Sequence, residues 1–84
     1  MLKINYFASI RESLGTATES LALPSGATTV ADLLSHLVTR HGAQGQILAE
    51  EDRVLVAVNQ TIVARDFPLK GDEEVAFFPP MTGG

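Results

Sequence analysis

The chain has 84 residues, of which 45% are apolar and 19% are charged, a composition typical of one small globular domain with a single core. It contains no cysteine, which excludes disulfides, thiolate metal ligands and a cysteine nucleophile. Its net charge of −4 argues against a nucleic-acid-binding surface, where a basic footprint is expected. No apolar run approaches the length of a membrane span, and we expect a cytoplasmic protein with neither nucleic-acid nor membrane partners.

The chain begins with a predicted strand over residues 1–8. Apolar and polar side chains alternate along this stretch, which is the pattern of a strand with one buried face. Phe7 falls on the face opposite the residues that we expect in the core, which are Leu2, Ile4 and Tyr6.

A short helical turn and a second strand are predicted next. Residues 9–15 are too few for an independent helix, but Ser9 stands at a capping position and Gly15 can end the turn. Alternation returns over residues 16–23, before a Pro-Ser-Gly turn. We therefore expect the first two strands to pair in antiparallel orientation.

Residues 29–41 form the principal predicted helix. Thr29 is the expected N-cap, Asp32 favours the same end through the helix dipole, and Gly42 is expected to end the helix in a left-handed conformation. The apolar residues recur at i, i+3, i+4, i+7 and i+8, and this stripe is predicted to pack in the core: Val30, Leu33, Leu34, Leu37 and Val38.

The remainder of the domain is predicted to consist of a loop and three strands. The polar stretch 44–53, with its acidic cluster, is expected to be a solvated loop. An apolar, β-branched run at 54–58 favours a central strand buried on both faces. A tight turn is predicted at Asn59-Gln60 and a short strand at residues 61–63. A second turn cluster follows at residues 68–72, and the last strand is predicted at residues 73–78.

This order of elements favours an α+β fold of the β-grasp type. A single main helix can cover one face of a mixed sheet of about five strands. The first and last long strands then become central neighbours through a right-handed crossover. The predicted domain spans residues 1–78, so a tail made of residues 79–84 would start from a central strand.

The predicted tail combines two prolines with two terminal glycines. Pro79 and Pro80 lack a backbone donor and stop sheet pairing, whereas Gly83 and Gly84 tolerate close approach to another molecule. Fully extended, the six residues would reach about 20 Å. We expect an extended arm that ends in a free α-carboxylate.

No other part of the sequence suggests an active site. His36 and His41 lie five residues apart, which does not place them on one helix face, and we predict no metal site. No nucleophilic triad or nucleotide-binding glycine loop is visible, so no bound cofactor is expected. The terminal carboxylate remains, and adenylation would turn it into a mixed anhydride that sulfur, an amine or a thiol can attack.

The sequence resembles the family of molybdopterin synthase small subunits, which are β-grasp sulfur carriers. The resemblance covers essentially the whole chain. It rests on residues 6–12 (YFASIRE), on Val58-Asn59-Gln60 and, most specifically, on residues 69–80 (LKGDEEVAFFPP) followed by Gly83-Gly84. Met81 stands where the family usually has valine.

The resemblance implies a specific chemistry for the tail. A ubiquitin-activating-like adenylyltransferase would use ATP to adenylate Gly84, and a sulfur donor would convert the adenylate to a thiocarboxylate. The tail, with Met81, Thr82 and Gly83, would then enter the synthase large subunit, which supplies the catalytic side chains. The sulfur would pass to a cyclic pyranopterin. Candidates for the docking surface are Phe7, Phe77, Phe78, Pro79, Pro80 and Met81, with Phe78 expected to be more exposed than Phe77.

Three other functions are compatible with the same terminus. A sulfur carrier for thiamine synthesis or tRNA thiolation shares the fold and the Gly-Gly end, although the Phe-Phe-Pro-Pro stretch favours the molybdopterin pathway. A ubiquitin-like modifier would join the activated glycine to a lysine through an amide bond. A plain β-grasp interaction module would have an inert tail.

Overall fold

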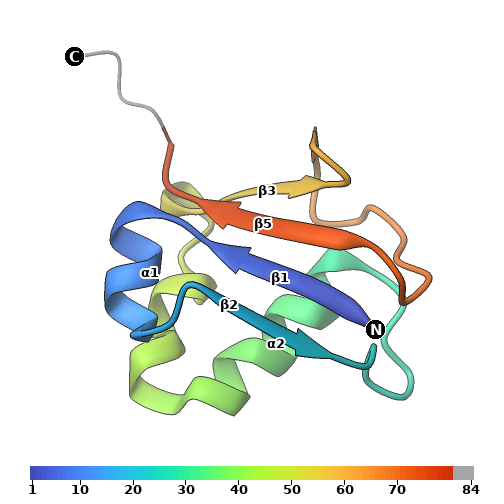
Figure 1. Ribbon diagram of the computed structural model, residues 1–84, viewed down its shortest axis with the longest axis horizontal. Helices are drawn as coiled ribbons and strands as arrows, with labels where there is room; N and C mark the ends of the chain where they lie inside the picture. Colours follow the sequence, from blue (N-terminus) through green and yellow to red (C-terminus); the bar gives the residue numbers. More distant parts are fainter. Residues whose placement is uncertain (81–84) are drawn as a thin grey trace.

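Five strands form one mixed sheet in the order β2-β1-β5-β3-β4 (Figure 1). The structure is a computed structural model and describes residues 1–80. The two central strands β1 and β5 run parallel, and every other neighbouring pair is antiparallel. This arrangement confirms the predicted α+β architecture. The strands are β1 (Leu2–Tyr6), β2 (Thr18–Leu21), β3 (Leu55–Val58), β4 (Thr61–Val63) and β5 (Glu74–Phe78).

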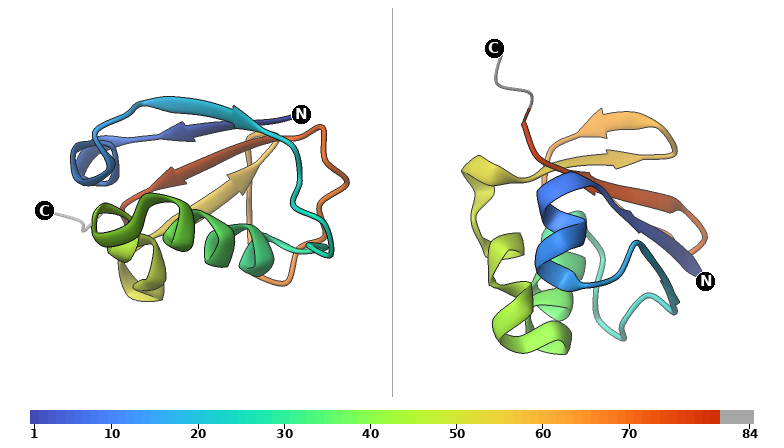
Figure 2. Two further views of the ribbon diagram at one scale, coloured as in Figure 1. Left: turned by 90° about the horizontal axis from the view of Figure 1, so that it is seen from below. Right: turned by 60° about the vertical axis from the view of Figure 1, so that its left-hand side comes forward.

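The main helix α2 (Val30–His41) lies across one face of the sheet (Figure 2). Its first turn is closed by a capping box, in which the Thr29 hydroxyl accepts from Asp32 N and the Asp32 carboxylate accepts from Thr29 N. Hydrogen bonds from the backbone of Thr28 and Thr29 hold the pKa of Asp32 below its usual value. Gly42 has the predicted positive φ of 64°, but its ψ of −133° is not left-handed helical.

The core lies between α2 and the sheet. Leu2, Ile4 and Tyr6 are buried on one face of β1, as their alternation predicts. Four residues of the helix stripe are fully or almost fully buried, and Val38 is half-buried against them. The Tyr6 ring stacks on Phe77 of β5 with 5.9 Å between ring centroids. The parallel central pair is therefore joined through its side chains as well as through its backbone.

The helix α1 (Ala8–Leu14) is longer than the single predicted turn. It starts directly after Phe7 without any side-chain cap, so the prediction of Ser9 as the cap was wrong. The helix is stabilised instead by burial of Ile10 and Leu14, a tertiary effect that local capping signals do not contain. Gly15 ends the helix in the left-handed conformation, as predicted.

The prediction of a solvated loop over residues 44–53 was wrong in its first half. A 3₁₀ helix, η1 (Gly42–Ala49), packs against α2 and buries Leu48. Gly45 makes this approach possible, because a Cβ at that position would lie 2.9 Å from the Cβ of His41. A second short 3₁₀ helix, η2 (Glu51–Arg53), carries most of the exposed acidic cluster.

The turns between the later strands match their sequence signals. Asn59 and Gln60 both have positive φ, 50° and 72°, which is typical of the mirror-image turn that suits a two-residue hairpin. This turn fixes the register of β3 against β4, with Val58 opposite Thr61.

The turn before β5 is organised by the buried carboxylate of Glu73. This carboxylate accepts hydrogen bonds from the backbone N–H groups of Lys70 (2.8 Å), Gly71 (2.8 Å) and Asp72 (3.1 Å). Burial raises the pKa of Glu73, but the backbone hydrogen bonds outweigh burial and leave the pKa below its usual value. The ionised form is therefore the one that the fold stabilises.

We expect Glu73→Gln to destabilise the domain by roughly 1–3 kcal/mol at neutral pH, since an amide replaces a charged acceptor of several backbone donors. Because the folded pKa of Glu73 is lowered, its contribution is present above the unfolded pKa of about 4.3 and is lost as pH falls through the folded value. Urea unfolding at several pH values measures this effect.

The exposed neighbour provides the control, since Asp72→Asn removes a carboxylate that organises no turn. We expect its free energy of unfolding to stay close to that of the parent chain. A Glu73→Gln difference that persists unchanged at acidic pH would contradict this role for the Glu73 carboxylate.

Candidate functional site

The C-terminal arm starts at the end of β5, between two neighbouring strands (Figure 1). On one side Phe7 N donates to Phe77 O at 3.0 Å, and on the other Leu55 of β3 lies opposite Phe78. Pro79 and Pro80 follow directly and are half-buried. The base of the arm is therefore held by the centre of the sheet.

The face of the sheet that points away from α2 carries an apolar surface beside this arm. Residues opposite one another in neighbouring strands share a face, and Ala57 pairs with both Ala76 and Ile62, while Leu55 pairs with Phe78. Ile62 is 64% exposed and Phe7 is 48% exposed. We call this surface the outer apolar patch; it contains Phe7, Leu55, Ile62, Ala76 and Phe78, which are exposed or half-buried, and the buried Ala57 between them.

The predicted docking residues have different positions in the structure. Phe7, Phe78, Pro79 and Pro80 all lie at the base of the arm and are at least partly exposed. Phe77 is completely buried, so its prediction as a docking residue was wrong, and Phe78 is the more exposed of the two. Met81, Thr82, Gly83 and Gly84 lie outside the described residues.

Ile62 was missed in the sequence analysis. A large aliphatic residue in a strand is normally assigned to the core, but the hairpin contains the information needed to place it. The two-residue turn sets Ala57 opposite Ile62, and since Val56 and Val58 face the core, Ile62 must face outward. Together with its apolar neighbours on this face, Ile62 forms a contiguous exposed apolar surface, which is typical of a contact site.

Polar clusters in residues 1–80 support structure and do not form a metal site. No group of three or more His, Asp or Glu residues in this range could hold a metal ion. The carboxylate of Glu19 accepts from Tyr6 Oη (2.7 Å) and Arg40 Nε (2.8 Å) and contacts His41 Nε2 at 2.6 Å. Burial raises the pKa of Glu19, but these hydrogen bonds outweigh it and lower the pKa below its usual value.

No helix within the described residues is long and apolar enough to cross a membrane.

Comparison with known sequences yields full-length relatives. Residues 4–84 match the model of the ThiS family. The chain is 42% identical to the molybdopterin synthase sulfur carrier subunit of Escherichia coli K12, with all of both chains covered. It is 34% identical to the protein of that name from Haemophilus influenzae, again with all of both chains covered.

Comparison with solved structures gives the same fold. SAMP1 from Haloferax volcanii superposes with a TM-score of 0.78 at 28% identity, covering 99% of this chain and 98% of that one. The small archaeal modifier protein 1 of Methanosarcina acetivorans superposes with a TM-score of 0.74 at 22% identity, covering 99% and 95%. With a family match that runs from residue 4 to Gly84 and relatives that match over their whole length, the chain belongs to the ThiS family.

Proposed function

We propose that this chain is the sulfur-carrier subunit of a molybdopterin synthase. The observation that carries the proposal is the full-length identity of 42% to a protein of that name, with a family match that includes the terminal glycine. The structure supports it through the position of the arm, which begins at a central strand beside an exposed apolar surface.

The proposed chemistry takes place on the α-carboxylate of Gly84. The carboxylate attacks the α-phosphate of ATP, pyrophosphate leaves, and an acyl adenylate forms on a separate adenylyltransferase. Hydrosulfide from a sulfur donor then attacks the carbonyl, AMP leaves, and the product is a thiocarboxylate. Transfer of its sulfur to a cyclic pyranopterin and addition of water restore the carboxylate, and two such transfers complete one dithiolene. Glycine suits this position because it leaves the carbonyl unhindered.

The folded domain would provide the binding surface for the enzymes that act on the tail. The large subunit and the adenylyltransferase must each hold the domain while Gly84 reaches their active sites. The outer apolar patch extends from the base of the arm across one face of the sheet, and it is the surface that we assign to this docking. The stiff Pro79-Pro80 pair would reduce the entropy lost when the arm is ordered by a partner.

Ile62→Asp is expected to weaken binding to the large subunit by about tenfold or more, because it places a charge where an apolar contact is buried on association. Ile62 lies on an edge strand and is mostly exposed, so folding should be unaffected. Calorimetric titration of the purified subunits measures the dissociation constant.

Thr18→Asp is the matched control for this variant. Thr18 pairs with Asn5, which places it on the same face of the sheet but at the opposite edge, away from the outer apolar patch. We expect it to bind normally. Equal losses in the two variants would point to a general charge effect and would remove the patch from the interface.

Intact-mass measurement tests the proposed function directly. The full-length chain is incubated with ATP, its adenylyltransferase and a sulfide source, and we expect a mass gain equal to replacement of one oxygen by sulfur. The loaded chain, mixed with the large subunit and the cyclic precursor, should then yield a dithiolene product. No mass gain with an enzyme that is active on another carrier would overturn the proposal.

A second function is favoured by one of the structural comparisons. The relative from Haloferax volcanii is called a small archaeal modifier protein, and it matches nearly the full chain at 27–28% identity. Attack on the same adenylate by a lysine amine would give an amide in place of a thiocarboxylate. Peptides from cell extracts that carry Gly84 on a lysine side chain would support this activity, and their absence under conditions of active sulfur transfer would exclude it.

A further inference from the structure

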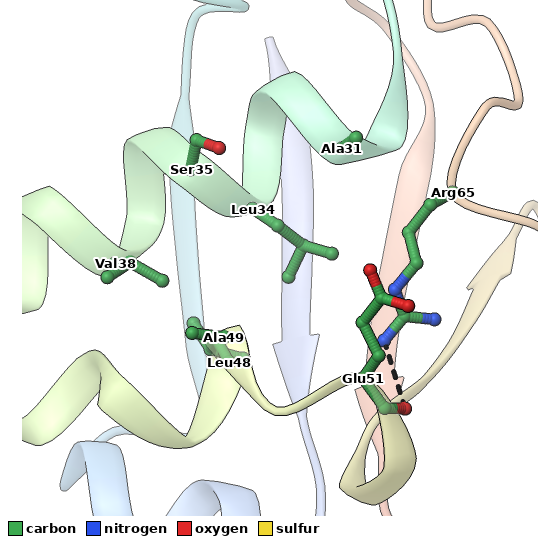
Figure 3. A pocket seen from close by; sticks show the side chains of 8 residues that line it. All are labelled: Ala31, Leu34, Ser35, Val38, Leu48, Ala49, Glu51 and Arg65. Atoms are coloured by element: carbon green, nitrogen blue, oxygen red, sulfur yellow. Dashed lines mark hydrogen bonds between the residues drawn. The ribbon is translucent and has the colours of Figure 1, made fainter.

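A cavity of about 370 Å³ lies between α2 and the 3₁₀ segment that follows it (Figure 3). It is on the helical side of the sheet, whereas the outer apolar patch occupies the opposite face. Nothing in the proposed sulfur-carrier function uses this cavity. Its lining consists of Ala31, Leu34, Ser35, Val38, Leu48, Ala49, Glu51 and Arg65.

The lining separates into an apolar part and a charged end. Leu34, Val38 and Leu48 provide aliphatic walls from two different elements. Figure 3 shows the side chains of Glu51 and Arg65 together at one end of the cavity, away from Val38 and Ser35. A cavity of this size with a few convergent polar groups is typical of sites for small molecules.

Arg65 has hydrogen-bonding capacity that the described residues do not use. Its Nη2 donates to Val54 O at 2.7 Å and to Glu51 O at 3.4 Å, which fixes the guanidinium in place. Its Nε is shielded from solvent and has no acceptor within residues 1–80. In the same range no carboxylate lies within 4 Å of the guanidinium. Within residues 1–80, the positive charge of Arg65 therefore has no carboxylate partner, and its Nε–H has no acceptor.

We propose that this cavity binds a compact apolar carboxylate, with its hydrocarbon part against the aliphatic walls and its carboxylate on Arg65. A guanidinium held by backbone carbonyls is pre-organised, and its planar donors match the two oxygens of a carboxylate. The Glu51 side chain lies at the same end and is exposed, so it can rotate into solvent when a ligand enters. The negative charge of Glu51 repels the carboxylate of the ligand. Removal of the Glu51 charge is therefore expected to strengthen binding.

The test is a ¹H–¹⁵N NMR titration of the full chain with sodium octanoate, compared with octylamine and octanol. These three probes share one hydrocarbon chain and differ in the charge of the head group. We expect saturable shifts for octanoate at the residues that line the cavity, and at least about tenfold weaker binding of the other two. Equal or tighter binding of octylamine or octanol, or no saturable shift with octanoate at millimolar concentrations, would overturn the proposal.

Three variants then locate the ligand. Arg65→Lys keeps the charge but removes Nε and the planar fork, and it should weaken octanoate binding by about tenfold. Glu51→Gln removes the opposing charge and should tighten binding by about two- to fivefold. Ser35→Trp alters an exposed rim position and should block the cavity without unfolding the chain.

The matched control for Arg65→Lys is Arg53→Lys, since Arg53 is exposed and lies outside this cavity. Its affinity for octanoate should equal that of the parent chain. Unchanged affinity in folded Ser35→Trp, or equal losses in the two arginine variants, would overturn the assignment. Because the readout is binding alone, its failure would leave the proposed sulfur-carrier function untouched.

Discussion

Removal of Gly84 is expected to lower the rate of thiocarboxylate formation at least about a hundredfold, while the melting temperature stays unchanged. The shortened chain still ends in a glycine carboxylate, but that group stops about 3.3 Å short of the activating site. A misplacement of even 1 Å at a reacting centre costs about a hundredfold in rate. Stability should not change, because β5 ends at Phe78 and the core that the structure describes within residues 1–80 ends at Phe77. Intact-mass kinetics and differential scanning calorimetry measure the two quantities.

Gly84→Ala distinguishes the effect of arm length from the effect of crowding at the reacting carbonyl. This variant keeps the length of the arm and adds one methyl group beside the carbonyl. We expect it to be activated more slowly than the parent chain but faster than the shortened one. If the shortened chain were loaded with sulfur at the parent rate, Gly84 would not be the reacting residue. A clear fall in melting temperature would instead show that the arm belongs to the folded domain.

The second large effect is expected in the core, where Leu37→Asp should prevent cooperative folding. Leu37 is fully buried on the helix stripe, and truncation of such a leucine to alanine alone costs about 2–5 kcal/mol. An unpaired carboxylate at the same site adds a desolvation cost. A small domain has only about 5–15 kcal/mol of stability in total. Circular dichroism during urea unfolding would show no native baseline.

His36→Asp provides the control on the same helix turn. His36 is exposed, so aspartate there buries no charge, and histidine and aspartate have similar helix propensities. We expect a loss of less than about 1 kcal/mol. A cooperative transition in Leu37→Asp close to that of the parent chain would contradict the placement of this helix face in the core.

The parts of the fold that were predicted correctly are those with local sequence signals. The N-cap at Thr29, the apolar stripe of α2 and the turn at Asn59-Gln60 each act over a few residues, and each is present in the structure. Period-two alternation likewise placed Leu2, Ile4 and Tyr6 in the core. The reason is that backbone capping, helical period and strand alternation depend on near neighbours.

The parts that were missed depend on contacts between segments far apart in the chain. The 3₁₀ helix η1 forms because Gly45 and Leu48 pack onto α2, and α1 extends over Ala8–Leu14 because Ile10 and Leu14 are buried. Local capping and polarity signals pointed the other way in both places. Burial of apolar side chains stabilises these two helices by more free energy than either local signal, so burial determines the secondary structure in both places.

The candidate site shows the same division. The sequence by itself pointed to the reactive group that we propose, because Gly-Gly after Phe-Phe-Pro-Pro can be recognised without knowing the fold. Only the tertiary structure showed that Phe77 is completely buried and brought Arg65 to a cavity formed by α2 and η1. Those features depend on strand register and on packing across the sheet, which no single segment encodes.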